Sequence, residues 1–286
     1  MTTFVELLKA VLFGIVEGIT EWLPISSTGH IILLESLWPL NVSLAFYDLF
    51  EIVIQLGAIL AVLVLFFHKL NPFSPRKSEI QKKDTWQLWF KVVAAVLPSA
   101  VLGLMLDEPL DNWLRGTPVL GTNLNTVIVA AALIVYGVAF ILVERKNARG
   151  DFRIQEVGRI DYKTAILIGA FQCLSIIPGT SRSGATILGA ILLGVSRSAG
   201  AEFSFFLAIP TMLGASALKL VKFLLDGVSA TSTELMVLIV GCVVSFLVSL
   251  AVIKGLMEYV RKHSFSVFGL YRIVLGVAVL GYFLLR

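Results

Sequence analysis

The chain has 286 residues, of which 57% are hydrophobic and 15% are charged, and its mean hydropathy is +0.91. About a quarter of the residues of an ordinary soluble domain are charged, so this composition excludes the soluble class and indicates a multi-pass membrane protein. The net charge of +4 arises from basic loops between apolar segments, and we therefore expect no nucleic-acid partner.

Two apolar segments are broken near their middle. Residues 4–37 are interrupted around Pro24, and residues 161–196 around Pro178 and Gly179. Proline removes a backbone donor and restricts the residue before it, and the Ser and Thr residues that follow are typical helix N-caps. Each broken segment therefore predicts a helix pair that enters the membrane and returns to the same side. Each is followed by three continuous runs near the ~20 residues that cross a bilayer. These runs are 44–68, 86–106 and 123–143, then 202–225, 234–257 and 266–285.

The order of these segments repeats. A shift of 155 residues aligns Gly14 with Gly169, Glu17 with Gln172, Ser26 with Ser181, Thr28 with Ser183 and Gly29 with Gly184. Because each half crosses the membrane an odd number of times, the second copy is expected to be inserted upside down. The sequence predicts a single all-α integral membrane domain over 1–286, with six full transmembrane helices and two re-entrant pairs. Two five-helix inverted repeats are expected, at approximately 1–145 and 160–286.

Basic residues gather in three loops, at about 69–83, 145–163 and 254–262, which the positive-inside rule places in the cytoplasm. Both chain ends then lie outside. The first helix pair enters from the external face and the second from the cytoplasmic face, so their tips meet near the midplane. The N-terminus has no basic region typical of a cleavable signal, and we expect it to be retained.

The first tip carries two carboxylates. Glu17 and Glu21 are four residues apart, which places them on one face of a helix. Two bare carboxylates there repel each other, so either one stays protonated or a divalent cation, Mg²⁺ or Ca²⁺, lies between them. A purely structural pair bonded to neighbouring helices is the alternative.

Hydroxyls and an imidazole follow these carboxylates. Ser26, Ser27 and Thr28 fit either ordinary helix caps or phosphate ligands. His30 lies in the first turn of the next helix, and a titratable imidazole beside hydroxyls is a candidate base or nucleophile.

The second tip has the composition of an anion site. Arg182 is a permanent cation inside an apolar region and is flanked by Ser181 and Ser183 at the start of a helix, with Thr186 one turn on. A helix N-terminus and an arginine fork both favour phosphate oxygens. The alternative is that Glu17 or Glu21 neutralises Arg182 as a structural ion pair. Nucleotide hydrolysis is excluded because the P-loop lysine is missing.

Weaker polar signals occur in the spans. Glu51 with Gln55, and Glu202 with Ser204, are expected to support the site or to bond neighbouring helices.

The two tips also carry a family resemblance. The Glu17-x-x-x-Glu21 pattern with the stretch 23–30, and the stretch 178–186, resemble the two signature motifs of the bacterial undecaprenyl-diphosphate phosphatases, the bacitracin-resistance protein family. The likeness extends over almost the whole chain. It implies an enzyme of the bacterial inner (plasma) membrane that removes the terminal phosphate of undecaprenyl diphosphate, recycling the lipid carrier for cell-wall synthesis. It further implies a divalent cation and an active site open to the periplasm.

Residues and resemblance together predict a site where the two tips meet, with the lipid tail between helices. The catalytic residues expected are Glu21, Ser27, His30 and Arg182; the substrate ligands are Ser26, Thr28, Ser181, Arg182, Ser183 and Thr186; the metal ligands are Glu17 and Glu21. Ser27 activated by His30 is the preferred nucleophile, with His30 itself and a metal-bound water left open. The competing hypothesis is a lipid flippase or transporter with an anionic-substrate site at the midplane. The sequence does not decide whether a homodimer forms.

Overall fold

The structure is a computed structural model that describes residues 2–119, 122–147, 150–227 and 229–284. Over these residues it consists of helices and loops with one very short hairpin, β1 (Pro118–Val119) and β2 (Thr122–Asn123). Six helices are long and apolar enough to cross a membrane, which confirms the predicted all-α, multi-pass class. They are α3 (Leu44–Leu65), α5 (Glu79–Gly116), α6 (Leu124–Lys146), α9 (Arg197–Leu225), α10 (Ser232–Lys262) and α11 (Ser266–Leu284).

Several of these helices extend beyond the apolar runs that predicted them. Helix α5 begins at Glu79 because Ser78 and Gln81 form a reciprocal capping box, and it continues through Pro98 and Pro109. Helix α10 begins at Ser232 with the same kind of box, from Thr231 and Glu234. The ends of these helices are therefore set by capping side chains, which satisfy the free N–H groups of the first turn, and not by hydropathy.

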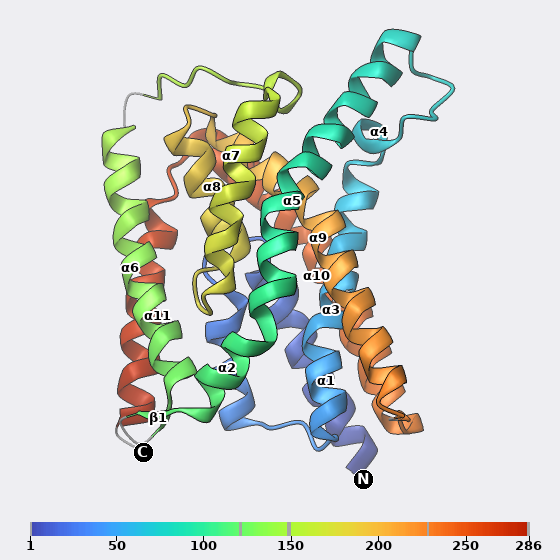
Figure 1. Cartoon of the computed structure of the whole chain (residues 1–286), viewed down its shortest axis with the longest axis vertical. Coiled ribbons are helices and arrows are strands. Elements are labelled where there is room, and N and C mark those ends of the chain that lie inside the picture. Colours follow the sequence, from blue (N-terminus) through green and yellow to red (C-terminus); the bar gives the residue numbers. More distant parts are fainter. Residues whose placement is uncertain (1, 120–121, 148–149, 228, 285–286) are drawn as a thin grey trace.

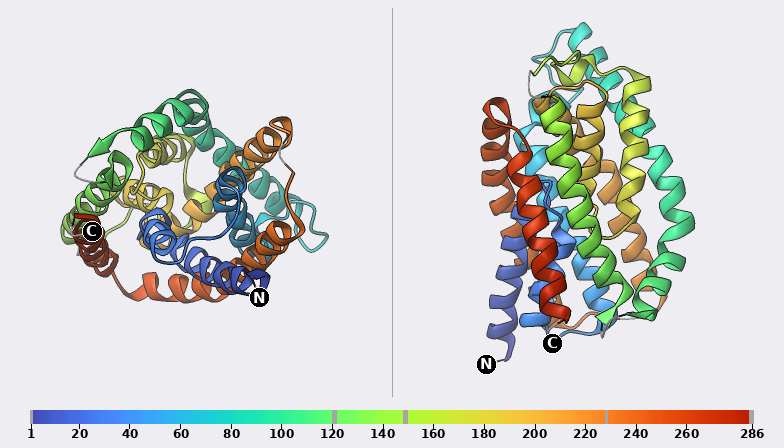
Figure 2. Two further views of the ribbon diagram at one scale, coloured as in Figure 1. Left: turned by 90° about the horizontal axis from the view of Figure 1, so that it is seen from below. Right: turned by 90° about the vertical axis from the view of Figure 1, so that its left-hand side faces the viewer.

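The two broken segments form two pairs of helices. The first pair is α1 (Thr2–Thr20) and α2 (Ser27–Leu37); the second is α7 (Tyr162–Gln172), continued by the 3₁₀ turn η2 (Cys173–Ile176), and α8 (Arg182–Leu192). Helices α1 and α2 lie in the lower half of the molecule, and α7 and α8 in the upper half (Figure 1). Helix α8 is buried on all sides from Ser183 to Ile191, and lies inside a ring of long helices (Figure 2). This arrangement is compatible with the predicted re-entrant pairs and inverted repeat.

Both breaks use the same unusual backbone geometry. Ser26, directly before α2, has φ of 72°, and Ser181, directly before α8, has φ of 70°. Within the described ranges these are the only non-glycine residues with positive φ. A left-handed serine is strained, by roughly 1–2 kcal/mol, so the surrounding contacts must hold it. Ser181 stands 155 residues after Ser26, the spacing at which the sequence repeats.

Close packing of small residues fixes the long helices around the breaks. A Cβ atom on Gly14 of α1 would lie 2.7 Å from the carbonyl oxygen of Gly241 in α10, and one on Gly137 of α6 would lie equally close to that of Gly269 in α11. Such backbone approach is the usual way helices associate in lipid, where apolar burial gives little driving force. Helix α10 is thereby held against α1, which leads into the first break, and α11 is held against α6.

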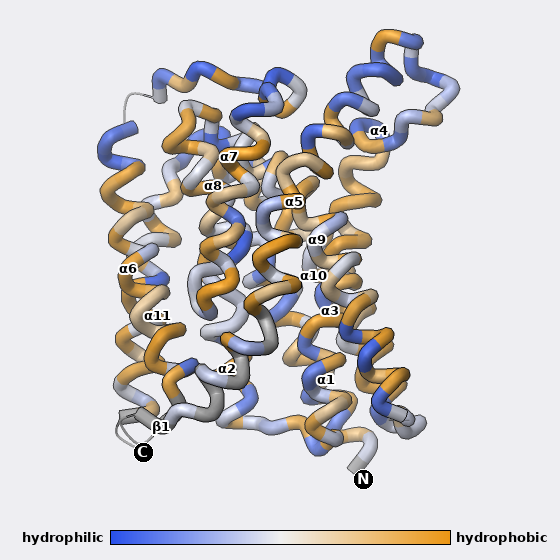
Figure 3. The backbone as a smooth tube through the Cα atoms, viewed as in Figure 1, coloured by the Kyte–Doolittle hydropathy of each residue, from blue (hydrophilic) through white to orange (hydrophobic). Residues whose placement is uncertain are grey.

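The polar loops gather at the two ends of the molecule. The loop with α4 (Phe67–Leu70) and the segment with the 3₁₀ turn η1 (Val157–Arg159) lie at the upper end, which Figure 3 shows as hydrophilic, and both chain ends lie at the lower end. The loop between α10 and α11 also lies at the upper end (Figure 2). The three basic loops therefore share one end, as the charge pattern predicts.

A candidate active site where the two helix breaks meet

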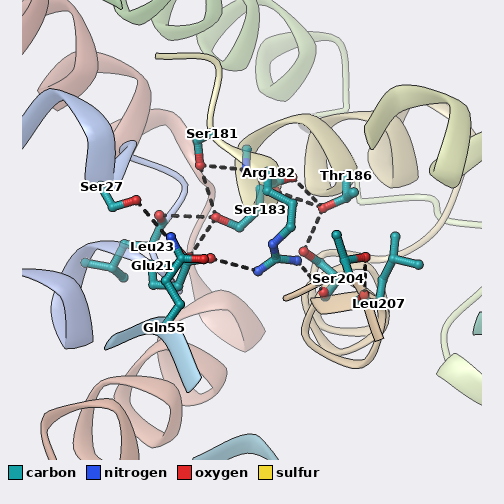
Figure 4. A network of polar contacts seen from close by, with 12 residues as sticks. Glu21, Leu23, Ser27, Gln55, Ser181, Arg182, Ser183, Thr186, Ser204 and Leu207 are labelled. Carbon is teal, nitrogen blue, oxygen red and sulfur yellow. Dashed lines mark hydrogen bonds and ion pairs between the residues drawn. The ribbon is translucent and has the colours of Figure 1, made fainter. Parts of the chain in front are cut away.

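An ion pair joins the two breaks. Arg182, the first residue of α8, donates from Nη2 to Oε1 of Glu21 at 3.1 Å and from Nη1 to the carbonyl oxygen of Ser204 in α9 at 2.9 Å (Figure 4). The two charged side chains are only 10% and 7% exposed. The Nε–H of Arg182 is buried and has no partner, so the guanidinium retains a donor for a ligand.

The other polar residues of the second break hold this arrangement in place. Ser183 donates to the carbonyl oxygen of Glu21 at 3.0 Å, and the hydroxyls of Thr186 and Ser204 lie 2.6 Å apart. Ser181 caps α8 by accepting from the N–H of Gly184 at 3.2 Å. Ser183 and Thr186 are almost fully buried, so their hydroxyls already act as links between the first break, α8 and α9.

Ser27 lies beside the ion pair. It begins α2 and donates from Oγ to the second carboxylate oxygen of Glu21 at 3.3 Å. Figure 4 shows its hydroxyl directed at Glu21, on the opposite side of that carboxylate from Arg182. One carboxylate thus contacts both the candidate nucleophile and the candidate phosphate-binding cation.

His30 has other partners than the sequence leads one to expect. Its Nδ1 lies 2.7 Å from the carbonyl oxygen of Ser26, and its Nε2 lies 2.7 Å from the hydroxyl of Tyr271 in α11. Helical side chains lean toward the helix N-terminus, and this brings the ring onto the carbonyl four residues back. Both ring nitrogens are therefore engaged, and neither bonds to Ser27.

The other hydroxyl residues of the first break are Ser26 and Thr28. Ser26 precedes α2 but its side chain does not cap it, and its buried Oγ has no partner. The left-handed backbone of Ser26 accompanies this departure from the expected cap. Thr28 lies half-buried in the first turn of α2.

Glu17 and Glu21 could provide two of the ligands of a divalent cation, with the remaining ligands supplied by water and substrate. Glu17 is 2% exposed, its Oε1 has no partner, and its carboxyl group is within hydrogen-bonding reach of Glu21. Among the described residues, no cluster of three or more His, Cys, Asp or Glu side chains has the arrangement of a metal site. Mg²⁺ is commonly held by one or two carboxylates together with water and substrate phosphate, which is what Glu17 and Glu21 offer.

Arg272 is the site residue that sequence reasoning missed. It lies in α11 with 0% exposure and donates from Nη1 to the carbonyl oxygen of Pro24 at 3.2 Å. Its Nη2 donates to the carbonyl oxygens of Gly179 at 2.8 Å and Thr180 at 2.9 Å. One buried cation thus bonds to both breaks. The signal was present, because Arg272 is an ionisable residue in the middle of the apolar run 266–285.

Of the polar residues that the sequence marks inside the spans, some lie at the site and others do not. Ser204 lies at the site, where it contacts Arg182 and Thr186. Glu202 instead pairs with Lys69 at 2.6 Å. Glu51 is close enough to Glu17 to interact with it electrostatically.

Comparison with known proteins identifies the family. Residues 10–278 match the model of the bacitracin resistance protein BacA family. A protein named undecaprenyl-diphosphatase from Streptococcus thermophilus is 56% identical over 278 residues, covering 97% of this chain and 93% of the relative. Proteins of the same name from Enterococcus faecalis (56% identical; 97% of each chain) and Latilactobacillus sakei (53%; 96% of this chain and 97% of the relative) are similar to it. The chain belongs to the bacitracin resistance protein BacA family.

Proposed function

We infer that this protein is an undecaprenyl-diphosphate phosphatase, an enzyme that converts undecaprenyl diphosphate to undecaprenyl phosphate and inorganic phosphate. The observation that carries this inference is the Glu21 carboxylate, which contacts the hydroxyl of Ser27 and the guanidinium of Arg182 together. A nucleophile, a proton acceptor and a phosphate-binding cation are the groups that phosphoryl transfer requires. A flippase or transporter needs the cation but not the paired hydroxyl and carboxylate.

The contacts favour a covalent mechanism. The Ser27 oxygen attacks the terminal phosphorus, the Ser27 proton passes to Glu21, and the bond from that phosphorus to the bridging oxygen breaks. Undecaprenyl phosphate leaves and takes up the proton. Water then attacks the phosphoserine, which releases inorganic phosphate and restores the Ser27 hydroxyl. Glu21 is the proton acceptor because Ser27 donates to it, whereas both nitrogens of His30 are engaged elsewhere.

Arg182 and the two helix starts bind the phosphate groups. The free N–H groups at the N-terminus of α8 and of α2 carry a partial positive charge. The unpartnered Nε–H of Arg182 adds a charged donor in a buried setting, where hydrogen bonds to anions are strong. Ser26, with its free buried hydroxyl, and Thr28 complete the proposed ligands of the first break, while Ser181, Ser183 and Thr186 shape the second.

We place a divalent cation, Mg²⁺ or Ca²⁺, on Glu17 and Glu21. When bound, it neutralises charge that develops on the phosphate oxygens during transfer. The unpartnered Oε1 of Glu17 supports this placement, because a buried carboxylate oxygen without a partner is costly.

The apolar helices and the basic loops support a location and an orientation for the enzyme in the membrane. Six helices are long and apolar enough to cross a membrane, so the polyprenyl tail is proposed to lie among lipids and helices while the diphosphate enters the polar centre. We place the protein in the bacterial inner membrane with its three basic loops in the cytoplasm, and we propose that the site opens to the periplasm.

Release of inorganic phosphate from undecaprenyl diphosphate by detergent-purified protein tests the function directly. We expect steady turnover that requires a divalent cation. Protein that binds the lipid and moves it between the leaflets of vesicles, yet releases no phosphate, would instead establish the transporter.

A further inference from the structure

The hydrogen bonds of His30 define its tautomer when the imidazole is neutral. A backbone carbonyl can only accept, so the Nδ1 that lies 2.7 Å from the oxygen of Ser26 carries a proton. In the neutral imidazole the other nitrogen, Nε2, is then an acceptor. The hydroxyl of Tyr271, 2.7 Å away, donates to it. The two rings are nearly parallel, at 8° with centroids 5.6 Å apart, so the phenol also fixes the plane of the imidazole.

Tyr271 is itself held in a defined place. The next residue in α11 is Arg272, whose bonds to the carbonyl oxygens of Pro24, Gly179 and Thr180 attach this turn of the helix to both breaks. The Arg272 guanidinium also lies 5.7 Å from the ring centroid of Tyr136 in α6. The hydroxyl that faces His30 therefore comes from a rigid turn of α11.

The contact from His30 reaches the proposed nucleophile through one peptide group. The carbonyl of Ser26 and the N–H of Ser27 belong to the same planar unit, so fixing the direction of one fixes the other. Ser26 is left-handed, with φ of 72°, a conformation that persists only where the surroundings enforce it. The Nδ1–H of His30 is the side-chain donor that holds its carbonyl.

We propose that Tyr271 is a positioning residue of the active site: its hydroxyl donates to Nε2 and holds the imidazole of His30 in place, so that the Nδ1–H selected by the Ser26 carbonyl stays on that carbonyl and fixes the Ser26–Ser27 peptide. The effect on turnover rests on the proposed role of Ser27. The tautomer of His30 does not depend on that role. His30 accordingly supports the nucleophile through its backbone and does not take the proton of Ser27.

A pair of isosteric substitutions tests the effect on turnover. Tyr271→Phe keeps the ring and removes the hydroxyl. Tyr282→Phe is the matched control, because its hydroxyl lies 3.2 Å from Ser36 and joins the same two helices, α11 and α2, away from the breaks. We expect Tyr271→Phe to lower kcat about tenfold, the effect of losing one neutral hydrogen bond, with little change in KM. Tyr282→Phe should stay within about twofold of the unchanged protein. Equal effects of the two substitutions on kcat would overturn the proposal.

Nitrogen NMR of the imidazole tests the tautomer independently of activity. With His68→Gln and His263→Gln, ¹⁵N-labelled histidine reports on His30 alone. We expect a protonated Nδ1 and an unprotonated Nε2. After Tyr271→Phe we expect exchange between both tautomers, because the ring loses the hydroxyl that keeps it on the Ser26 carbonyl. A dominant Nε2–H form, or no change after the substitution, would refute the positioning role. If the tautomer behaves as expected while Ser27→Ala retains activity, the proposed nucleophile fails and the Tyr271–His30 contact stands.

Discussion

Three contacts converge on Glu21. One carboxylate oxygen accepts from Arg182, the other accepts from Ser27, and the backbone carbonyl accepts from Ser183. A residue in this position sets the distance between the nucleophile and the phosphate-binding cation. Because the group is 7% exposed, its interactions operate in a low-dielectric setting, where they are stronger than at a surface.

Removing the Ser27 hydroxyl separates the candidate nucleophiles. We expect Ser27→Ala to lose at least about a thousandfold in kcat, because among the described residues no other hydroxyl donates to the Glu21 carboxylate. Acid quenching with labelled substrate should trap phosphate on Ser27 in the unchanged enzyme. Ser36→Ala, a serine near the far end of the same helix, is the control. A Ser27→Ala enzyme that keeps a tenth of its activity, a loss below ~1.4 kcal/mol of barrier, would rule out the covalent route.

The guanidinium of Arg182 should not be replaceable by an ammonium. Arg182→Lys keeps the charge but not the fork that reaches Glu21 and Ser204 together, so we expect a loss of at least about a hundredfold in kcat/KM. Arg197→Lys is the matched control, because Arg197 forms a comparable pair with Glu144 away from the breaks. Near-normal phosphate release by Arg182→Lys would show that a point charge suffices.

Cation dependence is expected to follow Glu17. Chelation with EDTA should abolish phosphate release, and Mg²⁺ or Ca²⁺ should restore it. Glu17→Gln should raise the cation concentration needed for half-maximal activity at least about tenfold, because a neutral amide is a weaker ligand for a hard cation. Glu202→Gln, a carboxylate paired with Lys69, controls for charge removal. Full activity in excess EDTA would contradict the metal assignment.

At the level of elements, helix α11 connects parts of the chain that are distant in sequence. Arg272 bonds to carbonyl oxygens of both breaks, and Tyr271 bonds to α2. Neither break could keep its left-handed serine on local propensity alone, since only glycine adopts that conformation freely. The last helix therefore acts as a structural support of the site although it contributes no proposed catalytic residue.

The two buried arginines should fail in different ways. Arg272→Met leaves three backbone carbonyls without their donor, each a loss of roughly 1–3 kcal/mol where no water replaces it, so we expect a clear drop in Tm in detergent. Arg182→Met should abolish activity, and it removes one carbonyl contact and the cation paired with Glu21, a carboxylate that can take up a proton in its place. Its Tm should fall less than that of Arg272→Met. The opposite order of Tm values would place the structural support at Arg182.

Sequence reasoning found what depends on local pattern. Pro24 and Pro178 mark the two breaks, and the long apolar runs mark the six spans, because cost in lipid depends on each residue alone. It missed contacts that depend on which way a helix face or a backbone carbonyl points. Arg272 gave a signal as an ionisable residue in an apolar run, but the pattern of α11 does not say which parts of the chain it contacts, and it gives no signal for Tyr271. The contacts of His30 with the Ser26 carbonyl and with Tyr271 could not be derived either, because the sequence does not show which groups face the ring.

At the scale of the whole molecule, the polar centre lies between two halves of the chain. Glu21 and Ser27 come from the first half, and Arg182 and Ser204 from the second. The predicted repeat at approximately 1–145 and 160–286 would give each half one break, and the matching left-handed serines agree with it. The site then exists only when both halves pack together.

Cysteine labelling tests the orientation in the membrane. In a background with Cys173→Ser and Cys242→Ser, a single cysteine at Ser229 should react with an impermeant thiol reagent added to intact cells. One at Ser78 should react only after the membrane is opened. Both positions are exposed, and Ser78 lies in a basic loop. The reverse labelling would place the basic loops outside and the active site at the cytoplasmic face.

In the ion pair between Glu21 and Arg182, the Glu21 carboxylate competes with the substrate phosphate for the guanidinium. A lipid phosphate can accept from the free Nε–H of Arg182, but it can take the Nη2 that faces Glu21 only by displacing that tethered carboxylate. A diphosphate carries more negative charge than a monophosphate, so it wins this exchange more readily. After the terminal phosphate has been removed, we expect the carboxylate to regain its partner and the lipid product to leave. A buried ion pair is weak evidence for stability, and we expect its larger effect on how quickly the enzyme releases its product.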